Sequence, residues 1–176
     1  MITSKRKRIS NVGLPKNLLT AIGHVAALWS QLEYVIDRKI TEILRLPGAP
    51  TVNPKLIIPF NQRLQLLEEL CDKYLANEEN RLHASRIILD LKQLSVQRNL
   101  IVHGSVANSK QRRKRQIVYW FRRISWDNPS KIERRSLTVS QVEVIASKIS
   151  DLIPAAMLIK AFFWAVEDSL LGRSEQ

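Results

Sequence analysis

Hydrophobic residues recur at steps of three and four along most of this chain, which is the spacing of one face of an α-helix. The first such stretch begins at Pro15 and ends near Leu46, just before the segment Pro47-Gly48-Ala49-Pro50, which is expected to stop a helix. The predicted buried face of this long helix consists of Leu18, Ile22, Val25, Trp29, Leu32, Ile36, Ile40 and Ile43.

Two further helices are predicted from the same spacing. The second spans residues 59–76 and ends at a predicted turn over residues 77–80, and Arg63 is placed on its outward side. Its inward positions are Phe60, Leu64, Leu67 and either Leu70 or Cys71. The third helix begins near Asn80, and its apolar seam runs through Ile87, Leu91, Leu94, position 98 and Ile101. Position 98 is an arginine, which is unusual in such a seam.

The pattern changes after Gly104. Residues 116–122 and 131–137 predict two strands joined by a turn at 127–130, giving a β-hairpin over about 115–138. A last helix is predicted to start near Ser140, where Ser140-Gln141-Val142-Glu143 fits a capping box, and to run to about Leu171 with a kink at Pro154.

These elements predict a mainly α fold, an up-and-down bundle of four or more helices with a β-hairpin inserted before the last long helix. The 176 residues, 45% of them hydrophobic, suit a single helical domain over residues 13–173, preceded by a basic, disordered tail over residues 1–12. The most apolar segment, residues 152–166, is too short to span a bilayer, and no secretion signal is seen. The single Cys71 excludes an intramolecular disulfide and is expected to be a core residue, so a cytoplasmic location without membrane contact is predicted.

The net charge of +12 points to a polyanionic partner. Residues 1–8 carry +4 and residues 98–135 carry +9, so the excess lies in the tail and around the hairpin. The cations predicted to contact RNA are Lys110, Arg112, Arg113, Lys114, Arg115, Arg122, Arg123, Arg134 and Arg135. The first five are nearly contiguous, and the last four are interleaved with the aromatic residues Tyr119, Trp120, Phe121 and Trp126. Bases stack on aromatic rings and phosphates pair with guanidinium groups, so the mixture suits single-stranded nucleic acid. The alternative is a solubilising basic loop whose aromatics pack the hairpin on the bundle.

The segment Arg98-Asn99-Leu100-Ile101-Val102-His103-Gly104 stands between the third helix and the hairpin. A buried, unpaired guanidinium at position 98 would cost several kcal/mol, so Arg98 is expected to have a partner or a wet pocket. Asn99 and His103 share a helix face, whereas Arg98 and His103 are separated by about 140° around a regular helix. The two meet on one phosphate only if the arginine reaches round or the helix unwinds near Gly104. His103 is at the helix end, where the dipole favours an imidazolium and Arg98 opposes it, and Gly104 is in the cap position.

This segment resembles the HEPN superfamily, whose motif is an arginine, often followed by Asn, His or Asp, and then a histidine four to six residues after the arginine near a helix end. The match is Arg98, Asn99 and His103, with four residues between the arginine and the histidine. The resemblance implies a metal-independent endoribonuclease that needs no cofactor and works as a homodimer with a composite cleft. It also implies products with 2′,3′-cyclic phosphate ends and a role as a toxin or in defence, with an antitoxin or regulatory partner. Other members of the superfamily lack activity and only bind.

The residue types suit that chemistry. Attack of a ribose 2′-OH on its own phosphate needs a base, an acid for the departing 5′ oxygen and a cation for the charge of the transition state. A dimer would supply two copies of His103 for proton transfer and two of Arg98 for charge stabilisation, while Asn99 would orient the phosphate or the imidazole. Glu33, four residues after Trp29 on the first helix, is the predicted acidic partner of Arg98, unless it is an ordinary surface residue.

Other polar residues are assigned structural roles. Asn61 and Arg63 are expected to be cap and surface residues, and His24 and His83 have no neighbours at metal-ligand spacing.

Two alternatives to the nuclease stay open. One is a non-catalytic nucleic-acid-binding module in which the motif is structural. The other is a protein-interaction scaffold whose last helix forms a dimer or binds a partner through Met157, Phe162, Phe163 and Trp164.

Overall fold

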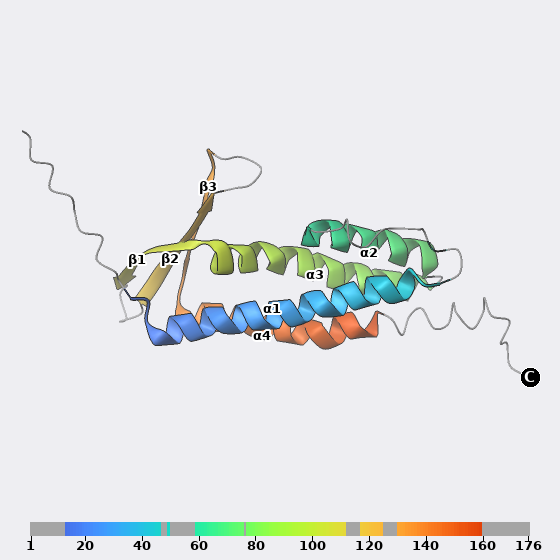
Figure 1. Cartoon of the computed structure of the whole chain (residues 1–176), viewed down its shortest axis with the longest axis horizontal. Coiled ribbons are helices and arrows are strands. Elements are labelled where there is room, and N and C mark those ends of the chain that lie inside the picture. Colours follow the sequence, from blue (N-terminus) through green and yellow to red (C-terminus); the bar gives the residue numbers. More distant parts are fainter. Residues whose placement is uncertain are drawn as a thin grey trace, which may run out of the picture.

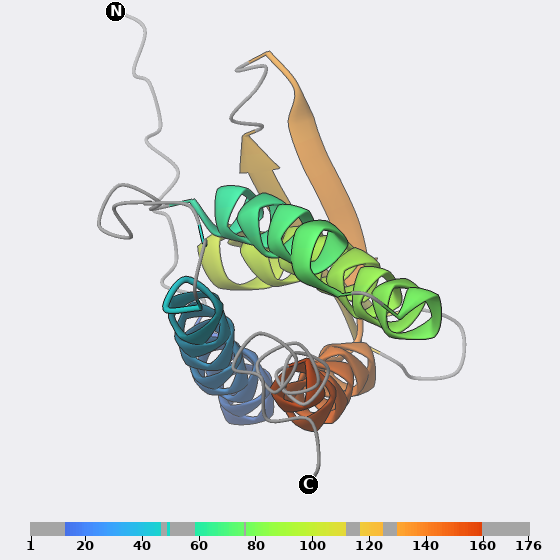
Figure 2. The same ribbon diagram turned by 90° about the vertical axis from the view of Figure 1, so that its right-hand side faces the viewer.

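The computed structural model describes residues 13–46, 49, 59–75, 77–111, 117–124 and 130–159, of which the side chains of 107–111 are left out. Over these ranges the chain forms four helices and a three-stranded antiparallel sheet between the third and fourth helices. The predicted fold class, a helical bundle with a β insertion before the last helix, is confirmed. Figures 1 and 2 show two layers of helices, α2 and α3 over α1 and α4, with the sheet at the end of the bundle where α3 ends.

The long helix α1 (Lys16–Ile43) buries the predicted apolar stripe, and only Ile22 of that stripe stays partly exposed. It lies along α4 (Val139–Leu158) in the lower layer of Figure 1. The shorter α2 (Phe60–Tyr74) packs on α3 and buries Leu64 and Leu67. Leu70 and Cys71 are both buried, so the helix directs both of the alternative inward residues into the core.

Helix α3 (Glu78–His103) begins slightly before the predicted start. The predicted turn at residues 77–80 is in fact the cap and first turn of this helix, because the Asn77 side chain accepts hydrogen bonds from the backbone N–H groups of Glu79 and Asn80. At the other end Gly104 is the C-cap residue, as predicted, in an extended conformation. A Cβ at Gly104 would overlap the carbonyl oxygen of Leu100, so close approach of backbone requires glycine here.

The sheet has one strand more than predicted. Strand β1 (Ser105–Gln111) follows α3 directly and pairs with β2 (Ile117–Ile124), which pairs in turn with β3 (Ile132–Leu137). The sequence of β1, SVANSKQ, has little hydrophobic alternation, and the strand exists through its pairing with β2. Of the predicted turn at 127–130, only Ser130 lies inside the described residues. Tyr119, Phe121 and Leu137 join the sheet to the bundle core.

Helix α4 is capped by Thr138 and not by Ser140, so the predicted capping box is wrong by two residues. The Thr138 side chain accepts from the Gln141 N–H, and the Gln141 side chain accepts from the Thr138 N–H, which completes a box around an earlier helix start. Pro154 lies within the helix. The predicted continuation to Leu171, including Phe162, Phe163 and Trp164, lies outside the described residues. In the ranges that are described, no helix has the length and apolar character needed to cross a membrane.

Candidate active site at the end of helix α3

Arg98 and His103 are brought together at the C-terminal end of α3. Nη1 of Arg98 lies 2.9 Å from Nε2 of His103 and donates a second hydrogen bond of 2.8 Å to Oδ1 of Asn99. The helix continues to His103, so the contact is made by the long arginine side chain reaching round the helix and not by unwinding near Gly104. One guanidinium nitrogen thus holds both of the residues that the motif predicts beside it.

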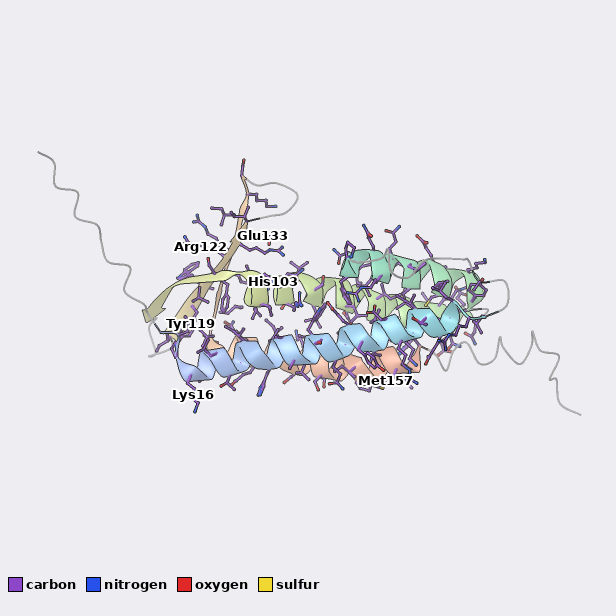
Figure 3. The ribbon with its side chains drawn as sticks, in the orientation of Figure 1. Lys16, His103, Tyr119, Arg122, Glu133 and Met157 are labelled. Atoms are coloured by element: carbon purple, nitrogen blue, oxygen red, sulfur yellow. The ribbon has the colours of Figure 1, made fainter. Side chains whose placement is uncertain are left out.

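The contact defines the role of the imidazole. A guanidinium group donates hydrogen bonds and cannot accept them, so Nε2 of His103 is the acceptor and its lone pair faces Arg98. A hydrogen bond in this direction requires the tautomer whose proton is on Nδ1. His103 is exposed, and Figure 3 shows it near the start of the sheet, so the imidazole is open to a substrate.

The ring of Trp29, on α1, lies against the guanidinium group of Arg98. The Cζ atom of Arg98 lies 5.5 Å from the centroid of the Trp29 ring, within the range of a cation–π contact. The indole is buried, packs edge-on against Phe60 at 4.8 Å between ring centroids, and donates from Nε1 to Oε1 of Glu33 at 2.6 Å. Trp29 is therefore a core residue, as its place in the apolar stripe predicts, and also the platform on which Arg98 rests.

Glu33 lies in the same cluster but makes its ion pair with another arginine. Its Oε2 is 3.5 Å from Nη2 of Arg63, and among the described residues no ion pair joins Glu33 directly to Arg98. Its charge still acts on Arg98. Burial lowers the pKa of the Arg98 guanidinium, and the Glu33 carboxylate opposes that change. Glu33 thus helps to keep a half-buried guanidinium charged.

Arg63 and Asn61, expected to be surface and cap residues, both line the site. Arg63 is only 15% exposed, and its Nη1 lies 2.7 and 2.6 Å from the two carboxylate oxygens of Asp37. Asn61 does not cap α2, because the cap residue is Pro59 and no side-chain hydrogen bond caps this helix. Instead, Oδ1 of Asn61 accepts a hydrogen bond of 3.5 Å from the Ser95 hydroxyl. Spacing could have indicated Arg63, because it lies three residues after Phe60 and four before Leu67, both of which face inward.

These residues line a cavity of about 350 Å³ that is open to solvent on one side. Its walls come from α1, from α3 and from the start of α2, and consist of Trp29, Glu33, Pro59, Phe60, Asn61, Arg63, Ser95, Arg98 and Asn99. The Nε atoms of Arg63 and Arg98 are buried and, within the part of the chain that the structure describes, have no hydrogen-bond partner. Each of the two arginines that line the cavity thus has one buried donor without an acceptor, which is costly for the folded state.

A second cavity, of about 300 Å³, lies between α3 and α4 and contains none of the predicted site residues. Asp90, Lys148 and Asp151 are among its lining residues. Over the described ranges no group of three or more His, Cys, Asp or Glu residues is arranged to hold a metal ion.

The predicted RNA-binding cations are divided among different settings. Arg122 and Arg134 are exposed and directly opposite each other on β2 and β3. Arg123 forms an ion pair of 2.8 Å with Glu133, and Arg135 is exposed opposite Phe121. Lys110 lies on β1 opposite Val118, and the side chain of Lys110 is not described. The remaining four cations, Arg112, Arg113, Lys114 and Arg115, lie outside the described residues.

The aromatic residues of the sheet are also divided. Tyr119 and Phe121 are 4% and 0% exposed and pack on the bundle, so the packing alternative is correct for these two rings. Trp120 is 38% exposed on the other face of the strand. Trp126 lies outside the described residues.

Comparisons of this chain with protein-family models, with curated proteins and with solved structures find no match.

Proposed function

We propose that this chain is a HEPN-like, metal-independent endoribonuclease that cleaves RNA in a composite site of a homodimer. The observation that supports the proposal is the 2.9 Å contact between Nη1 of Arg98 and Nε2 of His103. It joins a cation for a phosphate to a neutral imidazole for a proton, and both are required for attack by a ribose 2′-OH. The exposure of His103 and the adjacent cavity leave room for a phosphate.

The proposed reaction uses His103 of one copy as base, His103 of the second copy as acid, and Arg98 as the cation that binds the phosphate. A phosphate that binds the Arg98 guanidinium replaces His103 as its acceptor, and the freed Nε2 takes the proton of the 2′-OH. The 2′ oxygen bonds to phosphorus, the bond to the 5′ oxygen breaks, and a protonated His103 from the second copy gives that oxygen its proton. The products are a 2′,3′-cyclic phosphate and a 5′-OH. Asn99 fixes the guanidinium during these steps through its 2.8 Å hydrogen bond.

The test is incubation of the purified chain with RNA in EDTA, together with the variants His103→Ala and His24→Ala. Wild type is expected to cleave in the chelator, and His103→Ala is expected to lose at least about 100-fold in rate, the usual contribution of a general acid–base residue. His24 is an exposed histidine on α1 that does not line the cavity, so His24→Ala is the matched control and should cleave normally. Cleavage that stops on chelation, or full activity of His103→Ala, would reject the proposal. A monomer at the concentration of the assay would reject the composite site.

A second candidate function, a non-catalytic nucleic-acid-binding module, is favoured by the exposed arginines of the sheet, which do not need the Arg98–His103 pair in order to bind. It is expected to bind RNA without cleaving it, with a log–log salt slope of about 0.7 to 0.9 per phosphate contact. In either function the chain would meet RNA in the cytoplasm, a compartment that suits its single thiol. A toxin or defence role, with an antitoxin as partner, belongs to the first function only.

A further inference from the structure

The outer face of the sheet combines arginine and exposed apolar side chains. Residues directly opposite each other in an antiparallel pair project from the same face, so three pairs define this face. They are Trp120 with Ser136, Arg122 with Arg134, and Ile124 with Ile132. The alternate positions on β2, Tyr119 and Phe121, are buried against the bundle. On the opposite face of β2 Val118 is buried as well, and the exposed side chains are those of Trp120, Arg122 and Ile124.

The first strand of the sheet begins two residues after His103, at the end of the candidate active site. Ser105 begins β1 two residues after His103 and lies opposite Arg122, whose Nε donates to the Ser105 hydroxyl at 3.4 Å. A row therefore runs across the strands from Ser105 to Arg122 and on to Arg134, with about 5 Å between neighbouring strands. Figure 3 shows His103 and Arg122 at the same end of α3, where the sheet begins.

The charges of the face indicate an anionic ligand. Arg122 and Arg134 are directly opposite, and like charges in that relationship destabilise a sheet unless an anion lies between them. The next pair along, Arg123 with Glu133, has opposite charges and forms an ion pair. The two arginines of the outer face are thus placed to share one phosphate.

The position of Trp120 fits a nucleobase. It lies two residues before Arg122 on the same strand face, about 7 Å away along the strand, which is comparable with the length of one extended nucleotide. Its partly exposed ring is not needed in the core, which Tyr119 and Phe121 already fill. Exposed tryptophan beside arginine is the arrangement by which proteins stack bases of single strands and neutralise their phosphates.

We infer that Trp120 stacks a base of single-stranded RNA whose neighbouring phosphate lies between Arg122 and Arg134, next to the Arg98–His103 site. The inference rests on the proposed function in taking RNA as the ligand, but it concerns binding and does not require cleavage. Of the aromatic residues in the described sheet, it assigns base stacking to Trp120 alone, since Tyr119 and Phe121 are buried. It places the base and its phosphate along β2, with the phosphate at the Arg122–Arg134 pair.

The experiment measures binding of a short single-stranded 2′-O-methyl oligouridine, which cannot be cleaved by 2′-OH attack. The variants are Trp120→Ala, Trp120→Phe and Arg134→Ala. The matched control is Tyr34→Ala, which removes a 66% exposed aromatic ring on α1. Trp120→Ala is expected to weaken binding about tenfold or more, Trp120→Phe to restore most of the affinity, and Tyr34→Ala to leave it unchanged. Arg134→Ala should lower the log–log salt slope by about one phosphate contact, whereas Trp120→Ala should not change the slope.

Removal of the base provides a second arm. An abasic oligonucleotide should bind wild type and Trp120→Ala equally, because nothing is left to stack. Wild-type affinity of Trp120→Ala for the oligouridine would overturn the inference. So would a loss of self-association or of protein binding in Trp120→Ala with RNA affinity unchanged, since the face would then be a protein interface. If the wild-type chain binds RNA but never cleaves it, the nuclease proposal fails and the stacking inference is still decided by these affinities.

Discussion

Arg98 and His103 are five residues apart on α3, yet Nη1 of the arginine lies 2.9 Å from Nε2 of the histidine. The same nitrogen donates to Asn99, and the guanidinium rests over Trp29. A planar group with several fixed donors can satisfy these neighbours at once, whereas a point charge cannot. The orientation of His103 therefore depends on the shape of the side chain at position 98 as well as on its charge.

Arg98→Lys is the substitution that separates charge from shape. Lysine keeps the positive charge but loses the planar group that lies over Trp29 and holds both Asn99 and His103. We expect kcat for RNA cleavage to fall about 100-fold, as on removal of a preorganised donor to a developing charge. Single-turnover kinetics on a defined RNA measures the effect, and circular dichroism verifies the fold. Full activity of Arg98→Lys would mean that charge alone suffices.

Glu33 offers a pair of variants that separates its hydrogen bond from its charge. Glu33→Gln keeps an oxygen for the N–H of Trp29, and Arg63 keeps Asp37, so the free energy of unfolding should change by less than about 1 kcal/mol. Glu33→Ala leaves the buried Trp29 N–H without its acceptor and should cost about 1 to 3 kcal/mol. Urea denaturation of both variants measures the difference. Equal stabilities of the two variants would contradict the importance of the Trp29 hydrogen bond.

The helical core could be predicted because apolar residues at steps of three and four define the buried face of each helix within its own sequence. Arg98, Asn99 and His103 could be grouped because they lie on one continuous helix. Trp29, Asn61 and Arg63 could not be joined to them, since spacing identifies an inward residue without telling which other helix it faces. The cavity forms where α1, α2 and α3 meet, and that meeting is a property of the tertiary structure.

Strand β1 and the orientation of the β2 side chains could not be predicted from the sequence for the same reason. Ser105–Gln111 has too few apolar positions to predict a strand, and it becomes one by hydrogen bonding to β2. The run Tyr119-Trp120-Phe121 indicates contact with either the core or a ligand. Only the register of the sheet decides that Trp120 is exposed while its two neighbours are buried.

Cys71 gives a prediction for alkaline pH. Burial, with smaller contributions from the charges of Asp72 and Glu68, raises the pKa of the thiol from 9.0 to about 12. The folded state therefore favours the protonated thiol. Its contribution to stability is complete below pH 9 and is lost as the pH rises from about 9 towards 12, by up to about 1.4 kcal/mol per pH unit.

The measurement for Cys71 is the difference in unfolding free energy between wild type and Cys71→Ala as a function of pH. Alanine does not titrate, and all other groups are common to both proteins, so the difference isolates the thiol. We expect wild type to lose its advantage steadily above pH 9. A difference that stays constant across the alkaline range would show that the thiol is not shielded from solvent in the folded chain.

Gly104 and Gly23 form a contrasting pair for glycine substitution. A Cβ at Gly104 would overlap the carbonyl oxygen of Leu100 and would lie 3.3 Å from that of Arg122, so Gly104→Ala must shift the end of α3 against β2. We expect it to lower the free energy of unfolding by about 2 kcal/mol and to reduce RNA cleavage, because His103 precedes the displaced residue. Gly23 lies within α1 with no neighbouring atom within 4 Å of an added Cβ, so Gly23→Ala should stabilise the protein by about 1 kcal/mol through helix propensity. Urea denaturation and the cleavage assay are to be carried out on both variants. A Gly104→Ala protein as stable as wild type would contradict the close packing of α3 on the sheet.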